Sequence, residues 1–163
     1  MICTRVITCF NNSSSDCGRY GECVEISSNK YIVAQENSKK YCLVNPDSLK
    51  IGKIHVDGGS IVDEENKKCD YLFVFETSEA KNGVFIELKG KDCYTAINQI
   101  YETINVYKSF FNRVFARIVC RACPNFVIND ANTVRLKKLV KTLNGNLRIK
   151  SDIIEEKTNA LFS

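Results

Sequence analysis

Some residue types that often carry chemistry are scarce in this sequence. Histidine occurs once, at His55, and proline twice among 163 residues. A single histidine excludes a histidine-based catalytic triad and a two-histidine metal site within one chain. No apolar run approaches the roughly 18 residues that a membrane-spanning helix needs, and no glycine-rich phosphate loop is present. The sequence therefore argues against a membrane partner and against a motor driven by nucleotide triphosphates.

The composition is that of a globular domain. Apolar residues make up 44% of the chain and charged residues 26%, and the length suits one domain with a substantial core. We expect a single domain over residues 1–163, with an irregular N-terminal segment (1–50) that holds short strands, followed by a core (51–155). The net charge of +4 permits a nucleic-acid partner without requiring one.

The N-terminal sequence and the cysteines bear on the cellular compartment. Arg5 interrupts the only candidate apolar stretch near the start, which is unlike a secretory signal, so a cytoplasmic localisation is expected. In that compartment the cysteines should stay reduced, as thiols or metal ligands, without disulfides. The spacing of Cys120 and Cys123 is compatible with half of a structural Zn²⁺ site, although buried thiols are the favoured interpretation. The nine cysteines are Cys3, Cys9, Cys17, Cys23, Cys42, Cys69, Cys93, Cys120 and Cys123.

Hydrophobic periodicity predicts strands and helices, most clearly after residue 51. One helix is expected to begin at Asp92 or Thr95, and a second begins at Asp130 and ends at Asn144-Gly145. Three strands joined by short turns favour an antiparallel meander, which helix, strand, helix and strand then extend. The predicted fold class is therefore α/β, with a mixed sheet flanked by helices. The predicted strands cover 53–56, 60–62, 69–75, 84–89, 113–120 and 146–154, and less clear β-like runs cover 6–10, 31–34 and 41–44.

Two charged residues stand inside an otherwise apolar strand. Glu87 and Lys89 lie two residues apart, so their side chains leave the same face of the sheet. Charges in a central strand are costly unless they pair or bind something. Asp70 begins the preceding strand, and in an antiparallel hairpin it would lie beside Glu87 at the end of the next one. Two converging carboxylates favour Mg²⁺ or Mn²⁺. The simpler alternative is a Glu87–Lys89 ion pair without a function.

This arrangement resembles the PD-(D/E)XK nuclease superfamily, which has the restriction-endonuclease-like fold. The resemblance covers residues 51–120 and rests on Asp70, on Glu87-Leu88-Lys89 in a strand, and on Gln99 in the next helix. It implies that Asp70, Glu87 and the backbone carbonyl of Leu88 bind Mg²⁺ or Mn²⁺. Lys89 would orient or deprotonate the attacking water and offset charge in the transition state. Gln99 is similar to a glutamine that some branches of the superfamily place beside the metal.

The sequence departs from the family pattern because no acid stands on a helix before the first strand. Glu36, Glu25 and Glu22 are the candidates, and none lies on a convincing helix. Asp57, followed by two glycines, is predicted mainly as part of a turn, with an extra acid for the site as the alternative. His55 alternates with Asp57 along the strand and could face the site, although a surface or core position is favoured.

The resemblance implies a Mg²⁺-dependent endonuclease or exonuclease that acts on DNA, or less readily on RNA, in restriction, phage defence or repair. A homodimer is expected by analogy, since many nucleases of this fold cut duplexes as dimers. The missing helical acid leaves a second hypothesis, a catalytically inactive nuclease-like module that binds nucleic acid or protein. Under either hypothesis, basic residues of the second helix and the loops would follow a phosphate backbone. They are Arg135, Lys137, Lys138, Lys141, Lys39, Lys40, Lys67 and Lys68.

Overall fold

The computed structural model describes residues 5–11, 23–58, 60–61 and 67–161. In this part of the chain, no helix combines the length and the apolar character needed to cross a membrane. The strands are β1 (Val24–Ser27), β2 (Tyr31–Glu36), β3 (Lys39–Val44), β4 (Ile51–His55), β5 (Tyr71–Glu76), β6 (Lys81–Lys89), β7 (Arg113–Cys120), β8 (Leu147–Lys150) and β9 (Ile153–Lys157). The helices are α1 (Arg5–Asn11), α2 (Cys93–Tyr107), α3 (Asn125–Ile128) and α4 (Ala131–Thr142), with 3₁₀ turns η1 (Lys108–Phe110) and η2 (Thr158–Ala160).

Six strands form the main sheet, in the order β1-β4-β5-β6-β7-β8. β4, β5 and β6 pair antiparallel with their sequence neighbours, so the predicted meander is confirmed. β6, β7 and β8 pair parallel, because α2 crosses between the first two and α3 and α4 cross between the second two. β1 pairs antiparallel with β4 at the opposite edge. The predicted α/β class, with a mixed sheet flanked by helices, is confirmed.

A second sheet of three strands has the order β2-β3-β9. β2 and β3 form an antiparallel hairpin, and its turn residues Asn37 and Ser38 have φ angles of 46° and 61°. Two consecutive positive φ angles are typical of the tight turns that match the twist of a hairpin. β9 pairs parallel with β3. The segment that was expected to be irregular therefore supplies two strands of a separate sheet, as well as β1.

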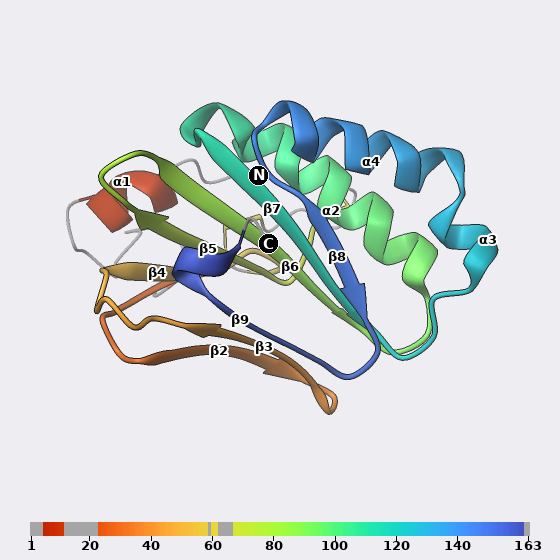
Figure 1. Cartoon of the computed structure of the whole chain (residues 1–163), viewed down its shortest axis with the longest axis horizontal. Coiled ribbons are helices and arrows are strands. Elements are labelled where there is room, and N and C mark those ends of the chain that lie inside the picture. Colours follow the sequence, from red (N-terminus) through yellow and green to blue (C-terminus); the bar gives the residue numbers. More distant parts are fainter. Residues whose placement is uncertain (1–4, 12–22, 59, 62–66, 162–163) are drawn as a thin grey trace.

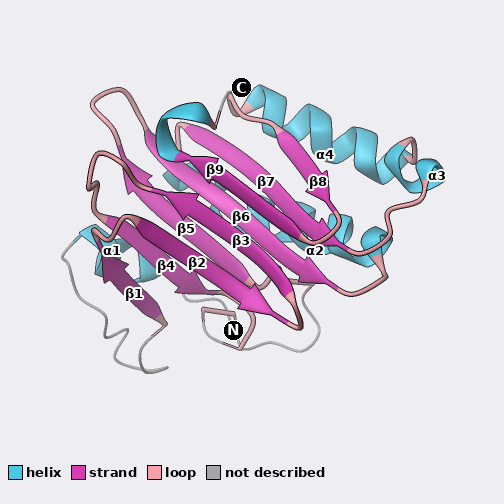
Figure 2. Ribbon diagram, turned by 60° about the horizontal axis from the view of Figure 1, so that its bottom comes forward, coloured by secondary structure: helices cyan, strands magenta, loops and turns pink. Residues whose placement is uncertain are grey.

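The molecule has three layers. Figures 1 and 2 show the second sheet on one face of the main sheet and α2 and α4 on the other face. One apolar core lies between the helices and the main sheet and includes Leu72, Phe85 and Ile100. Another lies between the two sheets and includes Phe73 and Ile86. β5 and β6 are buried on both faces, which explains why their sequences are continuous apolar runs. The prediction that they are central strands is therefore confirmed.

Three predicted strands are wrong. In the run 60–62, Ser60 lies in a turn and Ile61 forms only an isolated bridge with Asp57, while Val62 lies outside the described residues. The run 6–10 belongs to α1, where Ile7 and Phe10 lie three residues apart and are both buried against the helix-side core. The run 146–154 is divided between β8 and β9, which belong to different sheets. The chain turns between them at Asp152, whose Oδ1 accepts a hydrogen bond from Lys39 Nζ at 2.9 Å. This contact fixes the turn beside the start of β3.

A buried ion pair joins the two sheets. Arg117 of β7 is fully buried, and its Nε donates to Oε1 of Glu156 on β9. Tyr41 of β3 donates to the same oxygen at 3.0 Å, and Arg148 of β8 donates to Oε2 at 2.9 Å. Buried charges need partners of this kind because their desolvation is costly. The network therefore holds the second sheet in a defined place on the main sheet.

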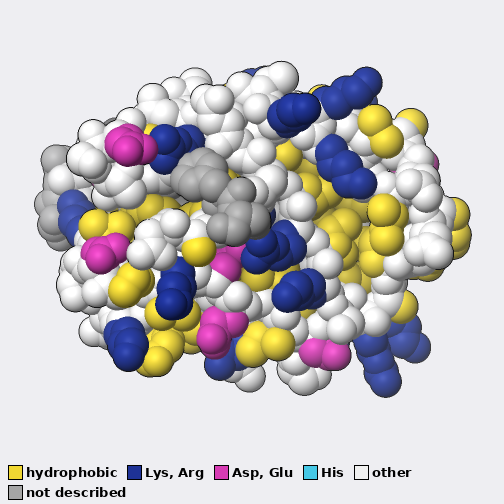
Figure 3. All heavy atoms as spheres, in the orientation of Figure 1, with side chains coloured by type: hydrophobic (Ala, Val, Ile, Leu, Met, Phe, Trp, Pro, Cys, Tyr) yellow, Lys and Arg dark blue, Asp and Glu magenta, His cyan; other side chains and the backbone are white. Residues whose placement is uncertain are grey.

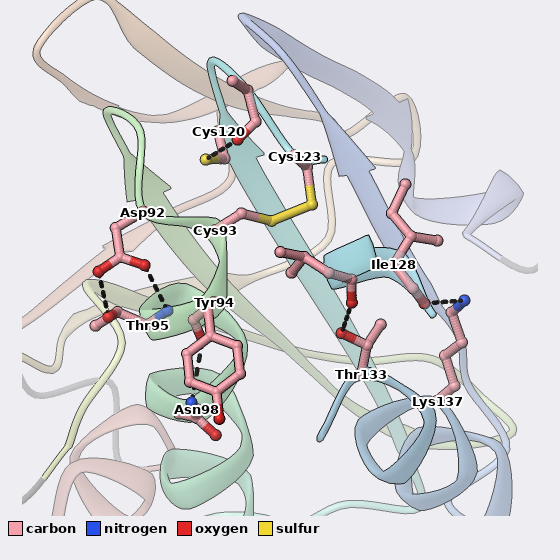
Figure 4. The surroundings of a disulfide bond; sticks show 12 residues. Asp92, Cys93, Tyr94, Thr95, Asn98, Cys120, Cys123, Ile128, Thr133 and Lys137 are labelled. Atoms are coloured by element: carbon pink, nitrogen blue, oxygen red, sulfur yellow. Dashed lines mark hydrogen bonds between the residues drawn. A yellow bond between two sulfur atoms is a disulfide. The ribbon is translucent and has the colours of Figure 1, made fainter. Parts of the chain in front are cut away.

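The expectation that all cysteines stay reduced is wrong, because Cys93 and Cys123 form a disulfide (Figure 4). The strands β6 and β7 end side by side, with Lys89 opposite Cys120, so the segments that follow them meet. The Cα atoms of the two bridged residues are 5.4 Å apart, as usual for a disulfide. Cys123 is thus paired with Cys93 at the start of α2, whereas Cys120 is a buried free thiol. Cys23 is also disulfide-bonded.

Removal of this bond should destabilise the fold. The two cysteines are 30 residues apart, and opening a loop of that length is expected to cost about 3–4 kcal/mol of the free energy of unfolding, mainly through the entropy of the unfolded chain. Urea denaturation of Cys123→Ala without reductant measures this loss. The double variant Cys93→Ala/Cys123→Ala should lose little more than either single variant, and fully additive losses would contradict the bond.

Candidate active site

The structure brings Asp70 and Glu87 together at one end of the β5–β6 hairpin. Tyr71 pairs with Ile86 in the ladder, so Asp70 and Glu87 follow as opposite neighbours just beyond it. The backbone N–H of Asp70 donates to Oε2 of Glu87 at 3.2 Å. In return, the backbone N–H of Leu88 donates to Oδ2 of Asp70 at 2.7 Å. Each carboxyl group is therefore fixed by the backbone of the strand that carries the other.

These two carboxyl groups are held in an environment that disfavours their charge. Burial raises the pKa of Asp70 to about 6, with Glu36 and Asp57 adding to the shift and the Leu88 N–H and Lys89 opposing it. Burial also raises the pKa of Glu87 to about 9, and the negative charge of Asp70 adds to it while Lys89 opposes it. A pKa of about 9 keeps Glu87 protonated at neutral pH in the metal-free protein, and a bound cation would favour the charged carboxylate by replacing that proton.

Lys89 lies beside this pair and reaches solvent. Its Nζ is 3.8 Å from Oε1 of Glu87, and its side chain is 33% exposed. The same Nζ donates to Oε1 of Gln99 at 3.3 Å, and Nε2 of Gln99 donates to the backbone carbonyl of Lys68 at 2.9 Å. The ammonium group is therefore aimed by a glutamine that is itself anchored, and it is not sealed in a salt bridge.

Helix α2 places Gln99 at this point. Asp92 caps the helix, accepting a hydrogen bond from the backbone N–H of Thr95 at 2.9 Å, as the sequence predicted. One turn after Gln99, the hydroxyl of Thr103 donates to the carbonyl of Gln99 and accepts from the backbone N–H of Cys69. The helix is thereby tied to the residue that precedes Asp70.

Leu88 takes part through its backbone. Its N–H holds Asp70, while its side chain is buried between the two sheets. The face assignment made from the alternation along β6 is correct, because Val84, Ile86 and Leu88 all belong to that second core. Glu87 and Lys89 leave the opposite face, toward α2.

Two further acids lie close to Asp70. A pocket of about 150 Å³ is lined by Glu36, His55, Asp57, Asp70 and Tyr71. Asp57 raises the pKa of both Asp70 and Glu87, and its Oδ1 is 3.4 Å from Nζ of the nearly buried Lys68. The turn interpretation also holds, since Gly58 has a φ of 73°. The turn interpretation is therefore confirmed, and the structure also places Asp57 in the same pocket as Asp70.

The three candidates for the missing helical acid differ in where they lie relative to the pocket. Glu36, at the end of β2, lines the pocket from the second sheet. Glu25, on β1, instead pairs with His55 and Lys53, and Glu22 lies outside the described residues. Helix α1 carries no acid. Within the described part of the chain, no three His, Cys, Asp or Glu side chains already surround one point as metal ligands, so a cation would have to draw the carboxylates inward.

Comparison of the chain with family models, curated proteins and solved structures finds no match.

The pKa of Glu87 leads to a testable pH dependence in metal-free protein. The folded-state pKa, about 9, lies above the ordinary value of 4.5, so between these values the folded state binds more protons than the unfolded state. The free energy of unfolding should therefore fall as the pH rises through this window. Thermal unfolding in a chelator measures it, and Glu87→Gln should flatten the slope. Glu79→Gln, at an exposed position, is the control, and an unchanged slope in Glu87→Gln would refute the prediction.

Proposed function

We propose that this protein is a metal-dependent nuclease with a restriction-endonuclease-like fold, acting on DNA in preference to RNA. The observation that carries the proposal is that Asp70 and Glu87, from two neighbouring strands, are held together beside Lys89. Glu87 is buried, whereas the side chain of Lys89 is 33% exposed and reaches solvent. A Glu87–Lys89 ion pair without a function would leave the fixed position of Asp70 and the anchoring of Gln99 unexplained. Restriction, phage defence and repair are the settings that such an activity would serve.

The donor set fits a hard divalent cation. Asp70 and Glu87 offer carboxylate oxygens, which Mg²⁺ and Mn²⁺ prefer, and the backbone carbonyl of Leu88 would add another oxygen. Burial is the main cause of the raised pKa values of both groups, because it disfavours their charged forms, and a bound cation would offset that cost. When bound, such an ion would neutralise charge on the scissile phosphate and polarise the attacking water.

The residues of the chain would divide the remaining work. Lys89, aimed by Gln99, would hold the attacking water in line with the phosphorus and stabilise charge that develops on the phosphoryl oxygens. Gln99 would act as a positioning residue, because its amide connects Lys89 with the backbone of Lys68. The reciprocal hydrogen bonds of Asp70 and Glu87 would keep both carboxylates in place while substrate binds.

We propose Asp57 as the third acid in place of the absent helical one. It is the acid whose charge acts on both Asp70 and Glu87. It also lies two residues after the end of β4, so the same meander that presents the other two acids would present this one. Lys68 would balance its charge in the absence of a cation.

The second candidate function is a nuclease-like module that binds nucleic acid or protein without cleaving it. The lack of any acid on α1 and the absence of preassembled ligands among the described residues favour it. Figure 3 shows Lys and Arg side chains spread over the visible face with Asp and Glu between them, so that face has no continuous basic band. The net charge of +4 is compatible with either function.

Replacement of Lys89 by alanine should abolish Mg²⁺-dependent cleavage without unfolding the protein. The lost charge stabilisation is expected to lower the rate at least about 100-fold, measured on labelled duplex and single-stranded DNA and RNA. Gln99→Ala should cause a smaller loss, since Lys89 would remain but lose its orientation. The matched control is Lys91→Ala, an exposed lysine two residues along the chain, which should cleave normally. Equal cleavage by Lys89→Ala would point to a contaminating nuclease.

Binding at increasing salt separates the two candidates. An inactive module should bind nucleic acid with an affinity that falls steeply with salt, because counterions are released from the phosphates, and should give no product with Mg²⁺ or Mn²⁺. Fluorescence anisotropy beside a cleavage assay measures both. Metal-dependent product eliminates the inactive module, whereas salt-dependent binding without product eliminates the nuclease.

A further inference from the structure

His55 is a wall residue of the pocket that contains Asp70. It ends β4 and pairs with Tyr71 in the ladder to β5, and the two rings meet edge to face with their centroids 4.9 Å apart. The same pocket is lined by Glu36, Asp57 and Asp70. The only histidine of the chain therefore stands among three carboxyl groups, a position that the proposed reaction does not yet use.

Glu25 fixes the orientation of this ring from the neighbouring strand β1. Oε1 of Glu25 is 3.0 Å from Nε2 of His55, and Oε2 is 3.5 Å from Nζ of Lys53. Glu25 is exposed and pairs with both Lys53 and His55, so it offers the ring a carboxylate oxygen as acceptor. Because an ionised carboxylate only accepts, Nε2 must carry the hydrogen of this bond. In the neutral ring, Nδ1 is then left with a lone pair, which the hydrogen bond to Glu25 does not use.

We infer that Nδ1 of His55 is a ligand of the divalent cation at the Asp70 site, and that it shifts the preference of the site from Mg²⁺ toward Mn²⁺. The inference rests on the proposed function, because it assigns one more ligand to the same cation. Histidine ligands of metals usually donate their second ring nitrogen to a carboxylate, which sets the tautomer and the direction of the ring. The Glu25–His55 pair has this construction. A nitrogen ligand suits Mn²⁺ and later transition metals better than Mg²⁺, which favours oxygen.

The surroundings favour a cation over a substrate phosphate as the group that His55 meets. Glu36, Asp57 and Asp70 line the same small pocket, and their negative charge would repel an anion that approached His55 alone. A lone pair among carboxylates is instead the donor set of a metal site. Glu36 of β2 and His55 of β4 would thus complete a site to which Asp57 and Asp70 contribute the other carboxylates of this pocket.

The experiment compares the binding of Mn²⁺ alone and Mg²⁺ alone by isothermal titration calorimetry, without nucleic acid. His55→Ala should weaken Mn²⁺ binding about 10- to 100-fold and leave Mg²⁺ binding nearly unchanged. Glu25→Gln should weaken Mn²⁺ binding less, because the ring would stay but lose its charged anchor. The control is Phe126→Ala, an exposed aromatic residue on α3 that does not line the pocket and should bind Mn²⁺ like the wild type.

A spectroscopic measurement checks the contact directly and does not depend on any variant folding. Since the chain has one histidine, its imidazole nitrogens give a single set of ¹⁵N signals. Addition of diamagnetic Cd²⁺ as a probe should shift the Nδ1 signal while the Nε2 hydrogen bonded to Glu25 persists. A shift with inorganic phosphate but not with Cd²⁺ would replace the metal assignment with a phosphate contact.

The outcomes separate this inference from the nuclease proposal. Loss of Mn²⁺ affinity in His55→Ala without cleavage of any nucleic acid would support the ligand and defeat the nuclease. Cleavage that depends on Lys89, together with Mn²⁺ affinity that is indifferent to His55, would defeat the ligand alone. A chain that binds neither ion would defeat both.

Discussion

The reciprocal hydrogen bonds between Asp70 and Glu87 are the constraint on which the candidate site depends. Each carboxyl group accepts from a backbone N–H of the opposite strand, so neither can turn away without breaking the end of the hairpin. Burial disfavours the charged form of both groups, and their charges would repel each other wherever both are ionised. Backbone hydrogen bonds therefore keep the two carboxyl groups together. Because both groups are fixed, Lys89 has a defined position relative to them.

The three-layer arrangement decides what surrounds this pair. α2 supplies Gln99 from one face of the main sheet, and the β2–β3 hairpin supplies Glu36 from the other layer. The buried Arg117–Glu156 pair fixes the second sheet on the first. An interaction far from the pocket thus sets where one of the pocket walls stands, because the hairpin and the ion pair share strand β3 through Tyr41.

Local sequence patterns were enough to predict much of the fold and part of the candidate site. Period-two alternation was enough to put Glu87 and Lys89 on one face, and the caps at Asp92 and Asp130 were correct. Features that depend on distant pairing were missed: β9 joins β3 across more than a hundred residues, and the short strand β1 brings Glu25 to His55. The disulfide depends on two parallel strands ending together, which spacing along the chain does not reveal. The proximity of Asp57 to the other acids could not be predicted, because the two glycines that follow it are accounted for by a turn alone.

The parallel pairing of β9 with β3 also bears on the order in which the molecule can be assembled. A two-stranded hairpin is marginally stable in water, so β2 and β3 gain a lasting place only when β9 adds the third strand. During synthesis the meander with Asp70 and Glu87 emerges before residues 153–157, which form the strand that completes the second sheet. A nascent chain would therefore hold its central acids while the wall that carries Glu36 is still unformed. Maturation of the pocket would then be a late event, completed after translation of the core instead of alongside it.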